Sequence, residues 1–188
     1  MMDVRVVDLA PHCDNHGIST SRWPTEGGFN IWANTYPAEQ LPAPGGTTDV
    51  GGVPFRFPAA GTGKADNIRC RGQRVAVPPG QFDWLYLLAA GERRTEDAIG
   101  LRYADGRTRT QWLRVSDFWP ETPARFGELL AFRCDRMNYP RHPQHNMAPA
   151  IWRTRVPVTE PGVLTGVLLP DNPALHVFAL TMVAEPEG

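Results

Sequence analysis

The succession of short strand-like segments is the feature that most restricts the fold of this chain. Alternating or β-branched runs recur along the 188 residues, and 18 glycines and 19 prolines separate them throughout instead of collecting in one linker. No long stretch keeps the 3.6-residue apolar spacing that predicts an amphipathic helix. Parallel strands need long crossover connections, usually helical. The sequence therefore predicts an all-β fold, an antiparallel two-sheet sandwich or jelly roll with only short helical turns.

Local patterns define the individual strands. The segment Phe82–Ala90 lacks polar alternation after Asp83, which predicts a central strand buried on both faces. Pro78–Gly80 is expected to stop the preceding strand. The pair Asp105–Gly106 between two alternating runs predicts a tight hairpin whose turn requires positive φ angles. The expected strands are residues 4–9, 53–57, 73–77, 82–90, 99–103, 108–115, 130–134, 151–156, 163–169 and 175–183.

The last strand and the sparse helical segments complete the expected fold. Strict alternation along 175–183 places His176, Phe178, Leu180 and Met182 on one face of the sheet. Single helical turns are expected within 37–41 and 123–130, both too short for a crossover. A length of 188 residues fits one domain spanning residues 1–188.

Charge and cysteine content restrict partners and location. The formal net charge is −1 and no basic block is present, which argues against nucleic acid as a partner. No run approaches the ~18 apolar residues of a membrane span, and residues 1–10 lack the apolar region of a secretory signal. Cys13, Cys70 and Cys134 have no metal-type spacing and predict free thiols in a reducing compartment. We therefore expect a cytoplasmic protein without membrane contact; its oligomeric state is left open.

Seven phrases occur in the order of a known type of bacterial β-sandwich. They are DNHGI (14–18), YPAEQLP (36–42), VGGVPF (50–55), DNI (66–68), YADG (103–106), LRVSDFW (113–119) and LPDNPALHVFALT (169–181). Together they resemble the galactose-binding-domain-like sandwiches, in particular the carbohydrate-binding-type modules of bacterial glycoside hydrolases. The resemblance implies a jelly roll with a ligand site in loops at one edge, and often a structural calcium ion. The sequence departs from it in the segment 138–146, and in lacking the signal peptide and catalytic domain that usually accompany such modules.

Two long irregular stretches, 11–48 and 138–149, are the expected location of a site, because long loops in compact domains are often functional. The first contains aromatic residues beside amide side chains, a combination that suits the C–H face and the hydroxyls of a sugar. The alternative is that these aromatics form a small core for the loop itself. The residues concerned are Trp23, Phe29, Trp32, Tyr36, Asn15, Asn30 and Asn34.

The second stretch is expected to meet the turn 116–119 at one end of the sandwich, with the first stretch as a third wall. Its prolines restrict the unfolded chain and hold the polar side chains in place. Asp117 could instead fasten its own turn through backbone N–H groups. The predicted ligand-binding set, here called the loop-end residues, comprises Trp32, Asp117, Trp119, Tyr139, Arg141, His142 and His145.

The histidines suggest two further chemistries. His12 and His16 lie four apart, and His142 and His145 three apart; neutral imidazole binds zinc and similar metals. The neighbouring prolines argue against the helices that would bring such pairs together, so no metal site is predicted. His142 or His145 could instead form an acid–base pair with Asp117, since histidine titrates near neutral pH. His176 is expected to be a hydrogen-bonded core or sheet-face histidine.

Three functions follow from these patterns. The leading expectation is binding of a small polar ligand, a carbohydrate or polyhydroxyl compound. The first alternative is a cofactor-independent enzyme of specialised metabolism, an isomerase, cyclase or hydrolase, using His142, His145 and Asp117. The second is a protein-interaction domain. An open groove floored by tryptophan would favour ligand binding, and a deep histidine-lined pocket would favour the enzyme. A large exposed apolar patch would favour the protein-interaction domain.

Overall fold

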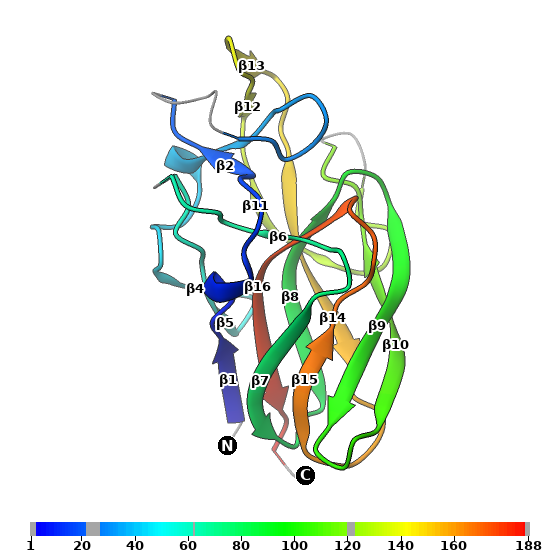
Figure 1. Cartoon of the computed structure of the whole chain (residues 1–188). Coiled ribbons are helices and arrows are strands. Elements are labelled where there is room, and N and C mark those ends of the chain that lie inside the picture. The colour runs from blue at the N-terminus through cyan, green and yellow to red at the C-terminus, as the bar shows by residue number, and fades with distance from the viewer. Residues whose placement is uncertain (1–2, 22–26, 62, 120–122, 187–188) are drawn as a thin grey trace.

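Two antiparallel sheets form the body of the molecule. The computed structural model describes residues 3–21, 27–61, 63–119 and 123–186. The six-stranded sheet has the order β1 (Asp3–Val7), β16 (Leu175–Ala184), β8 (Trp84–Gly91), β14 (Ala150–Pro157) and β11 (Leu129–Arg133), with β6 (Ile68–Arg69) also paired to β16. The four-stranded sheet has the order β10 (Thr108–Val115), β9 (Thr95–Tyr103), β15 (Leu164–Leu168) and β7 (Arg74–Gly80). The two sheets face each other (Figure 1), which confirms the predicted sandwich.

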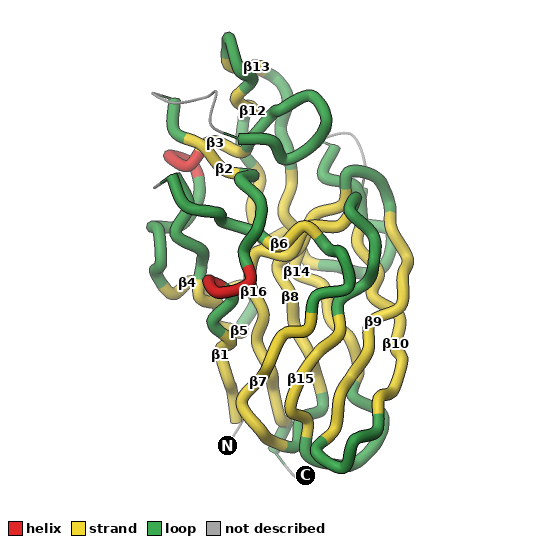
Figure 2. The backbone as a smooth tube through the Cα atoms, viewed as in Figure 1, coloured by secondary structure: helices red, strands yellow, loops and turns green. Residues whose placement is uncertain are grey.

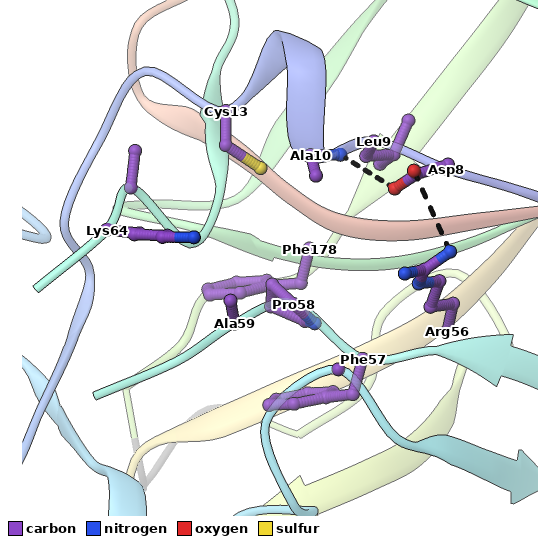
Figure 3. A pocket seen from close by; sticks show the side chains of 12 residues that line it. Asp8, Leu9, Ala10, Cys13, Arg56, Phe57, Pro58, Ala59, Lys64 and Phe178 are labelled. Carbon is purple, nitrogen blue, oxygen red and sulfur yellow. Dashed lines mark hydrogen bonds and ion pairs between the residues drawn. The ribbon is translucent and has the colours of Figure 1, made fainter. Parts of the chain in front are cut away.

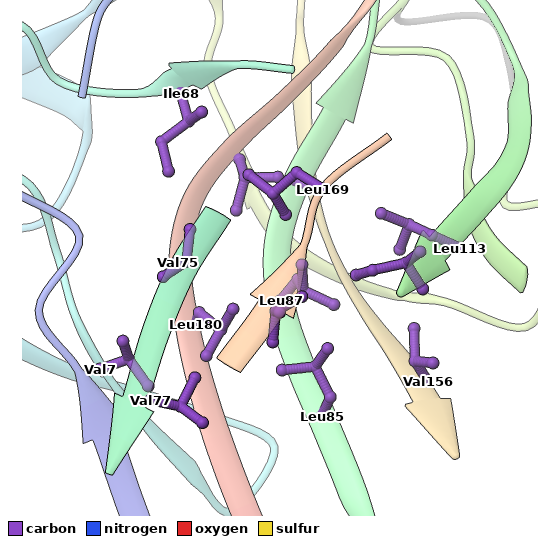
Figure 4. Close-up of a cluster of buried hydrophobic side chains, with 14 of the residues drawn as sticks. Val7, Ile68, Val75, Val77, Leu85, Leu87, Leu113, Val156, Leu169 and Leu180 are labelled. Carbon is purple, nitrogen blue, oxygen red and sulfur yellow. The ribbon is translucent and has the colours of Figure 1, made fainter. Parts of the chain in front are cut away.

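The space between the sheets is filled by aliphatic side chains from both inner faces. Leu85, Leu87 and Leu180 of the larger sheet pack in one cluster with Val75 and Leu113 of the smaller one (Figure 4). Each such side chain contributes about 1.5–3 kcal/mol when fully buried. Strand β8 is buried along nearly its whole length, as predicted, because its alternate residues enter a second cluster on the other face of the sheet.

A third layer covers that other face. Tyr36, Phe55 and Phe57 are fully buried against it. The elements outside the two sheets are η1 (Ala10–His12), β2 (Ile18–Ser19), β3 (Tyr36–Pro37), η2 (Ala38–Gln40), β4 (Thr47–Val50), β5 (Val53–Arg56), β12 (Arg136–Asn138) and β13 (Pro143–His145). Most of this layer is loop with very short strands (Figure 2), and β2 pairs with β3 in parallel. Phe29 and Tyr36 of the first long stretch are therefore core residues, as the alternative for its aromatics proposed, but they share this core with the large sheet, and Trp32 is exposed.

All ten expected strand segments are strands, with differences at their ends. Strand β7 continues through Pro78–Gly80 instead of stopping before it. Because β7 is an edge strand, it tolerates prolines that cannot donate to a neighbour. A helical turn occurs at Ala38–Gln40, within the predicted 37–41. The turn expected in 123–130 is absent; its residues form bends and the start of β11.

The predicted hairpin joins β9 to β10. The N–H of Gly106 donates to the carbonyl of Tyr103 (3.1 Å), and that of Tyr103 donates to the carbonyl of Arg107 (2.9 Å). Gly106 has φ 88°, whereas neither Ala104 nor Asp105 has positive φ. The connection is therefore a three-residue loop with one left-handed glycine, not a two-residue turn with two positive φ angles.

A β-bulge in β16 overturns the predicted alternation of its side chains. The pairing of β16 with β8 shifts register between Val177 and Ala179. Val177 and Leu180 both enter the core between the sheets, while Phe178 and Ala179 both enter the second cluster. Because a bulge rotates the strand locally, Phe178 faces away from Leu180 and toward the third layer.

Candidate functional site

A pocket lies between the N-terminal segment and the chain after β5. Its volume is about 470 Å³, within the range of small-molecule sites. Phe178, displaced by the bulge, forms part of its wall together with Pro58 and Cys13 (Figure 3). The residues that line it, here called the β5 pocket, are Asp8, Leu9, Ala10, Cys13, Gly45, Arg56, Phe57, Pro58, Ala59, Lys64, Ala65 and Phe178.

Backbone hydrogen bonds fix both sides of the β5 pocket. On one side the N–H of Phe57 donates to Gly46 (2.8 Å) and the carbonyl of Pro58 accepts from Gly45 (3.0 Å), which holds the chain after β5. On the other side the carbonyl of Leu9 accepts from His12 and Cys13 and closes η1. These hydrogen bonds position both walls of the β5 pocket within the protein.

Three charged side chains stand at the rim. Asp8 pairs with Arg56 at 3.7 Å, and both side chains are about half exposed (50% and 54%), so the pair is weak. A carboxylate oxygen of Asp8 also accepts from the N–H of Ala10 (3.1 Å). Among the described residues the ammonium of Lys64 has no hydrogen-bond or ion-pair partner. Figure 3 shows Lys64 and Arg56 on opposite sides of the pocket.

Cys13 contributes an inert wall. Burial, with a smaller effect of the nearby carboxylates including Asp66, raises the pKa of its thiol to about 12. Since the thiolate is the nucleophilic form, this thiol has no nucleophilic role at neutral pH. All three cysteines are free, as predicted; Cys70 and Cys134 are buried and Cys13 is partly buried.

A buried carboxylate lies directly behind the pocket wall. Asp66 is fully buried, and its oxygens accept from the N–H groups of Gly17 (2.9 Å) and Ile18 (3.1 Å) and from Asn67 Nδ2 (2.7 Å). Desolvation raises the pKa of Asp66 to about 7, against the opposing effect of these donors. Because Asp66 follows Ala65 of the β5 pocket, this network anchors the pocket wall to the first long stretch.

His176 extends the same network into β16. Its Nδ1 lies 2.9 Å from Asn67 Oδ1, and its Nε2 lies 3.2 Å from Glu92 Oε1, which Arg69 also contacts at 2.9 Å. Its ring packs on Phe29 at 4.2 Å between centroids. Desolvation lowers the pKa of His176, so the ring is neutral at pH 7. The expectation of a hydrogen-bonded core histidine is confirmed.

The loop-end residues lie mostly at the surface. The side chains of Trp32 and Trp119 are 61% and 42% exposed. Trp32 lies on a turn in which the N–H of Ala33 donates to the carbonyl of Asn30. The rings of Tyr139 and His142 are stacked at 5.7 Å with an interplanar angle of 8°. Arg141, His142 and His145 are exposed on the β12–β13 hairpin, which projects beyond the sandwich (Figure 1).

The first long stretch contacts both other segments at this end of the molecule. Thr35 and Asn138 exchange two backbone hydrogen bonds of 2.8 and 2.9 Å, and Asn34 Nδ2 donates to the hydroxyl of Tyr139 (3.3 Å). The ring of Phe29 packs on Phe118 at 4.9 Å. The first stretch thus contacts each of the other two segments, at Asn138 and Tyr139 and at Phe118.

Asp117 is not joined to the histidines of the hairpin. Its Oδ1 accepts the N–H of Trp119 (2.9 Å), the turn-fastening role that the sequence also allowed. Burial raises the pKa of its carboxyl group. In the described part of the chain no contact links Asp117 to His142 or His145, so the acid–base alternative has no geometry to support it.

Metal binding also lacks a suitable cluster. Within the described ranges no three His, Cys, Asp or Glu side chains gather closely enough to hold an ion, so the four histidines do not come together as a metal site there. Trp23 lies outside the described residues. The described helical segments include none that could span a membrane.

The sequence had not pointed to the β5 pocket. Its residues come from five separate parts of the chain, and most belong to unremarkable apolar or turn segments. Asp66 and Asn67 belong to the DNI segment (66–68), and the residues around them carry no signal of a pocket. A lone lysine among 19 basic residues was the one available signal.

Comparison with known proteins places the chain in a family. The family model described as the AziU2-like beta-sandwich domain matches residues 3–186, nearly the whole chain. No curated protein matches the chain. The match agrees with the β-sandwich of the expected resemblance and gives no support to a galactose-binding-like carbohydrate module. The chain belongs to the AziU2-like β-sandwich domain family.

Proposed function

We propose that this domain binds a small polar ligand in the β5 pocket. The observation that carries the proposal is the combination of an apolar wall, including the partly exposed Pro58 and Ala59, with charged side chains at the rim. Small-molecule sites are typically concave and mostly apolar, with a few polar groups that orient the ligand. The second cluster and the Asp66 network hold the wall rigidly, which reduces the ordering cost of binding.

The test is a ligand screen read by two-dimensional NMR of the labelled protein, using sugars, polyols, sugar acids and small organic acids. Ala10 is exposed at the rim and its backbone makes the bond to Asp8, so Ala10→Trp should cover the mouth without removing that bond. Ala104→Trp, at an exposed alanine in the β9–β10 turn, is the matched control. We expect binding to be lost in Ala10→Trp only. A screen without pocket ligands, or ligands indifferent to Ala10→Trp, would reject the proposal.

A second candidate is carbohydrate binding at the loop end. The observation that favours it is the exposure of Trp32 and Trp119, since exposed indoles suit the faces of sugar rings. Affinity electrophoresis in polysaccharide gels tests it. Trp32→Ala and Trp119→Ala should lose retardation, whereas Trp112→Ala, which removes a 59% exposed indole from β10, should not. Equal behaviour of all three variants would exclude this site.

A further inference from the structure

We propose that the ligand of the β5 pocket is an organic anion, whose carboxylate or phosphate group is bound by Lys64 and whose apolar body lies against the partly exposed Pro58 and Ala59. This inference rests on the proposed function of the pocket and specifies its ligand class.

The charge balance of the rim is the first argument. Asp8 lies opposite Arg56 and accepts the N–H of Ala10, so the charges of Asp8 and Arg56 offset each other in the total charge of the rim. Lys64 is exposed and unpaired among the described residues. The rim therefore presents one uncompensated positive charge beside an apolar wall, and the complementary ligand carries a negative group on an apolar body.

The nearby carboxylates do not cancel this charge. Asp66 accepts three N–H groups, and Asp14 accepts from the N–H of Arg69 (2.8 Å) and from Gln73 Nε2 (2.9 Å). Both are therefore occupied within the protein framework. A cationic ligand would have to displace Arg56 from Asp8 and would face Lys64 as well.

Arg56 provides a second, conditional contact. Because the Asp8–Arg56 pair is long and half exposed, an incoming anion can compete with Asp8 for the guanidinium. Removing the charge of Asp8 should therefore strengthen anion binding, whereas removing Lys64 should weaken it. Opposite effects from two residues at one rim distinguish a specific anion site from general attraction.

The single lysine permits a direct measurement. Reductive methylation with ¹³C-formaldehyde labels only Lys64 and the terminal amine, so the NMR spectrum holds one resonance from the pocket and one internal control. The probes are benzoate and phenyl phosphate, with benzamide as the neutral analogue of benzoate. We expect both anions to shift the Lys64 resonance saturably and benzamide to leave it in place.

Variants extend the test without the label. Affinity for phenyl phosphate, measured by ligand-observed NMR, should fall about five- to tenfold in Lys64→Gln, be retained in Lys64→Arg, and rise a few-fold in Asp8→Asn. Arg71→Gln removes the same charge from an exposed side chain outside the pocket and should change little. Circular dichroism of each variant confirms that it is folded.

Different outcomes would overturn the anionic nature of the ligand and the binding of any ligand in the β5 pocket. Equal binding of benzoate and benzamide, binding of neither anion, or equal losses in Lys64→Gln and Arg71→Gln would overturn the anion inference alone. Failure of the Ala10→Trp screen to reveal any pocket ligand would overturn the proposed function itself.

Discussion

The buried carboxylate of Asp66 gives the domain an unusual dependence of stability on pH. Its pKa is about 7 in the folded protein against 3.8 for an unburied aspartate, a rise caused mainly by desolvation. Below about pH 4 the group is protonated in both states. Between about pH 4 and 7 it is ionised only when unfolded, so this contribution to stability falls as pH rises, and it is constant above the folded pKa.

The size of the effect follows from the shift. Roughly three pH units at 1.36 kcal/mol each give a loss of roughly 4 kcal/mol between pH 4 and 7. Asp66→Asn cannot ionise and removes this term. Neutral His176, whose pKa is lowered by burial, contributes in the opposite direction, because its stabilisation is lost as pH falls. The difference between wild type and variant cancels that contribution.

Urea unfolding followed by tryptophan fluorescence at pH 4 to 8 measures this difference. The unfolding free energy of wild type minus that of Asp66→Asn should decrease steadily up to about pH 7 and then level off. A difference independent of pH would refute the reasoning. An increase with pH would show that the N–H groups of Gly17, Ile18 and Asn67 outweigh desolvation and hold the pKa of Asp66 low.

Three further predictions concern stability. Gly106→Val should lower the urea midpoint by an amount corresponding to about 1–3 kcal/mol, because valine resists φ 88°, while Gly106→Asn should cost less; equal costs would contradict this. Gly17→Ala should destabilise by about 1–3 kcal/mol, since a Cβ would lie 2.6 Å from Nδ2 of Asn67, and an unchanged midpoint would show that the amide moves freely. His142→Ala and His145→Ala should leave the Tm within a few degrees, because both side chains are exposed; a collapse in either would reveal a structural role.

The strands were predictable because their signals are local. The apolar run of β8 and the Asp105–Gly106 turn are each defined by a few neighbouring residues, so short-range patterns reveal both. The histidine in β16 was also identified correctly, since a polar residue inside an apolar strand needs a hydrogen-bond partner. The partner itself, Asn67, was not predictable from the sequence near His176.

The bulge and the pocket depend on distant parts of the chain. The face occupied by Phe178 is set by the register of β16 against β8, which strand alternation alone does not reveal. Lys64, Asp8 and Phe178 line one pocket although they lie far apart in the sequence. At the loop end, Tyr139 and His142 were placed together by a short turn, whereas a contact between His142 and Asp117 would have required long-range geometry that the sequence does not encode locally.

The location of the bound ligand tests the central claim most directly. Intermolecular nuclear Overhauser effects can be recorded between the ring protons of phenyl phosphate and the assigned protein. We expect contacts to the methyl group of Ala59 and to the ring of Pro58, both in the β5 pocket. Contacts confined to Trp32 and Trp119 would contradict it and assign binding to the loop end instead.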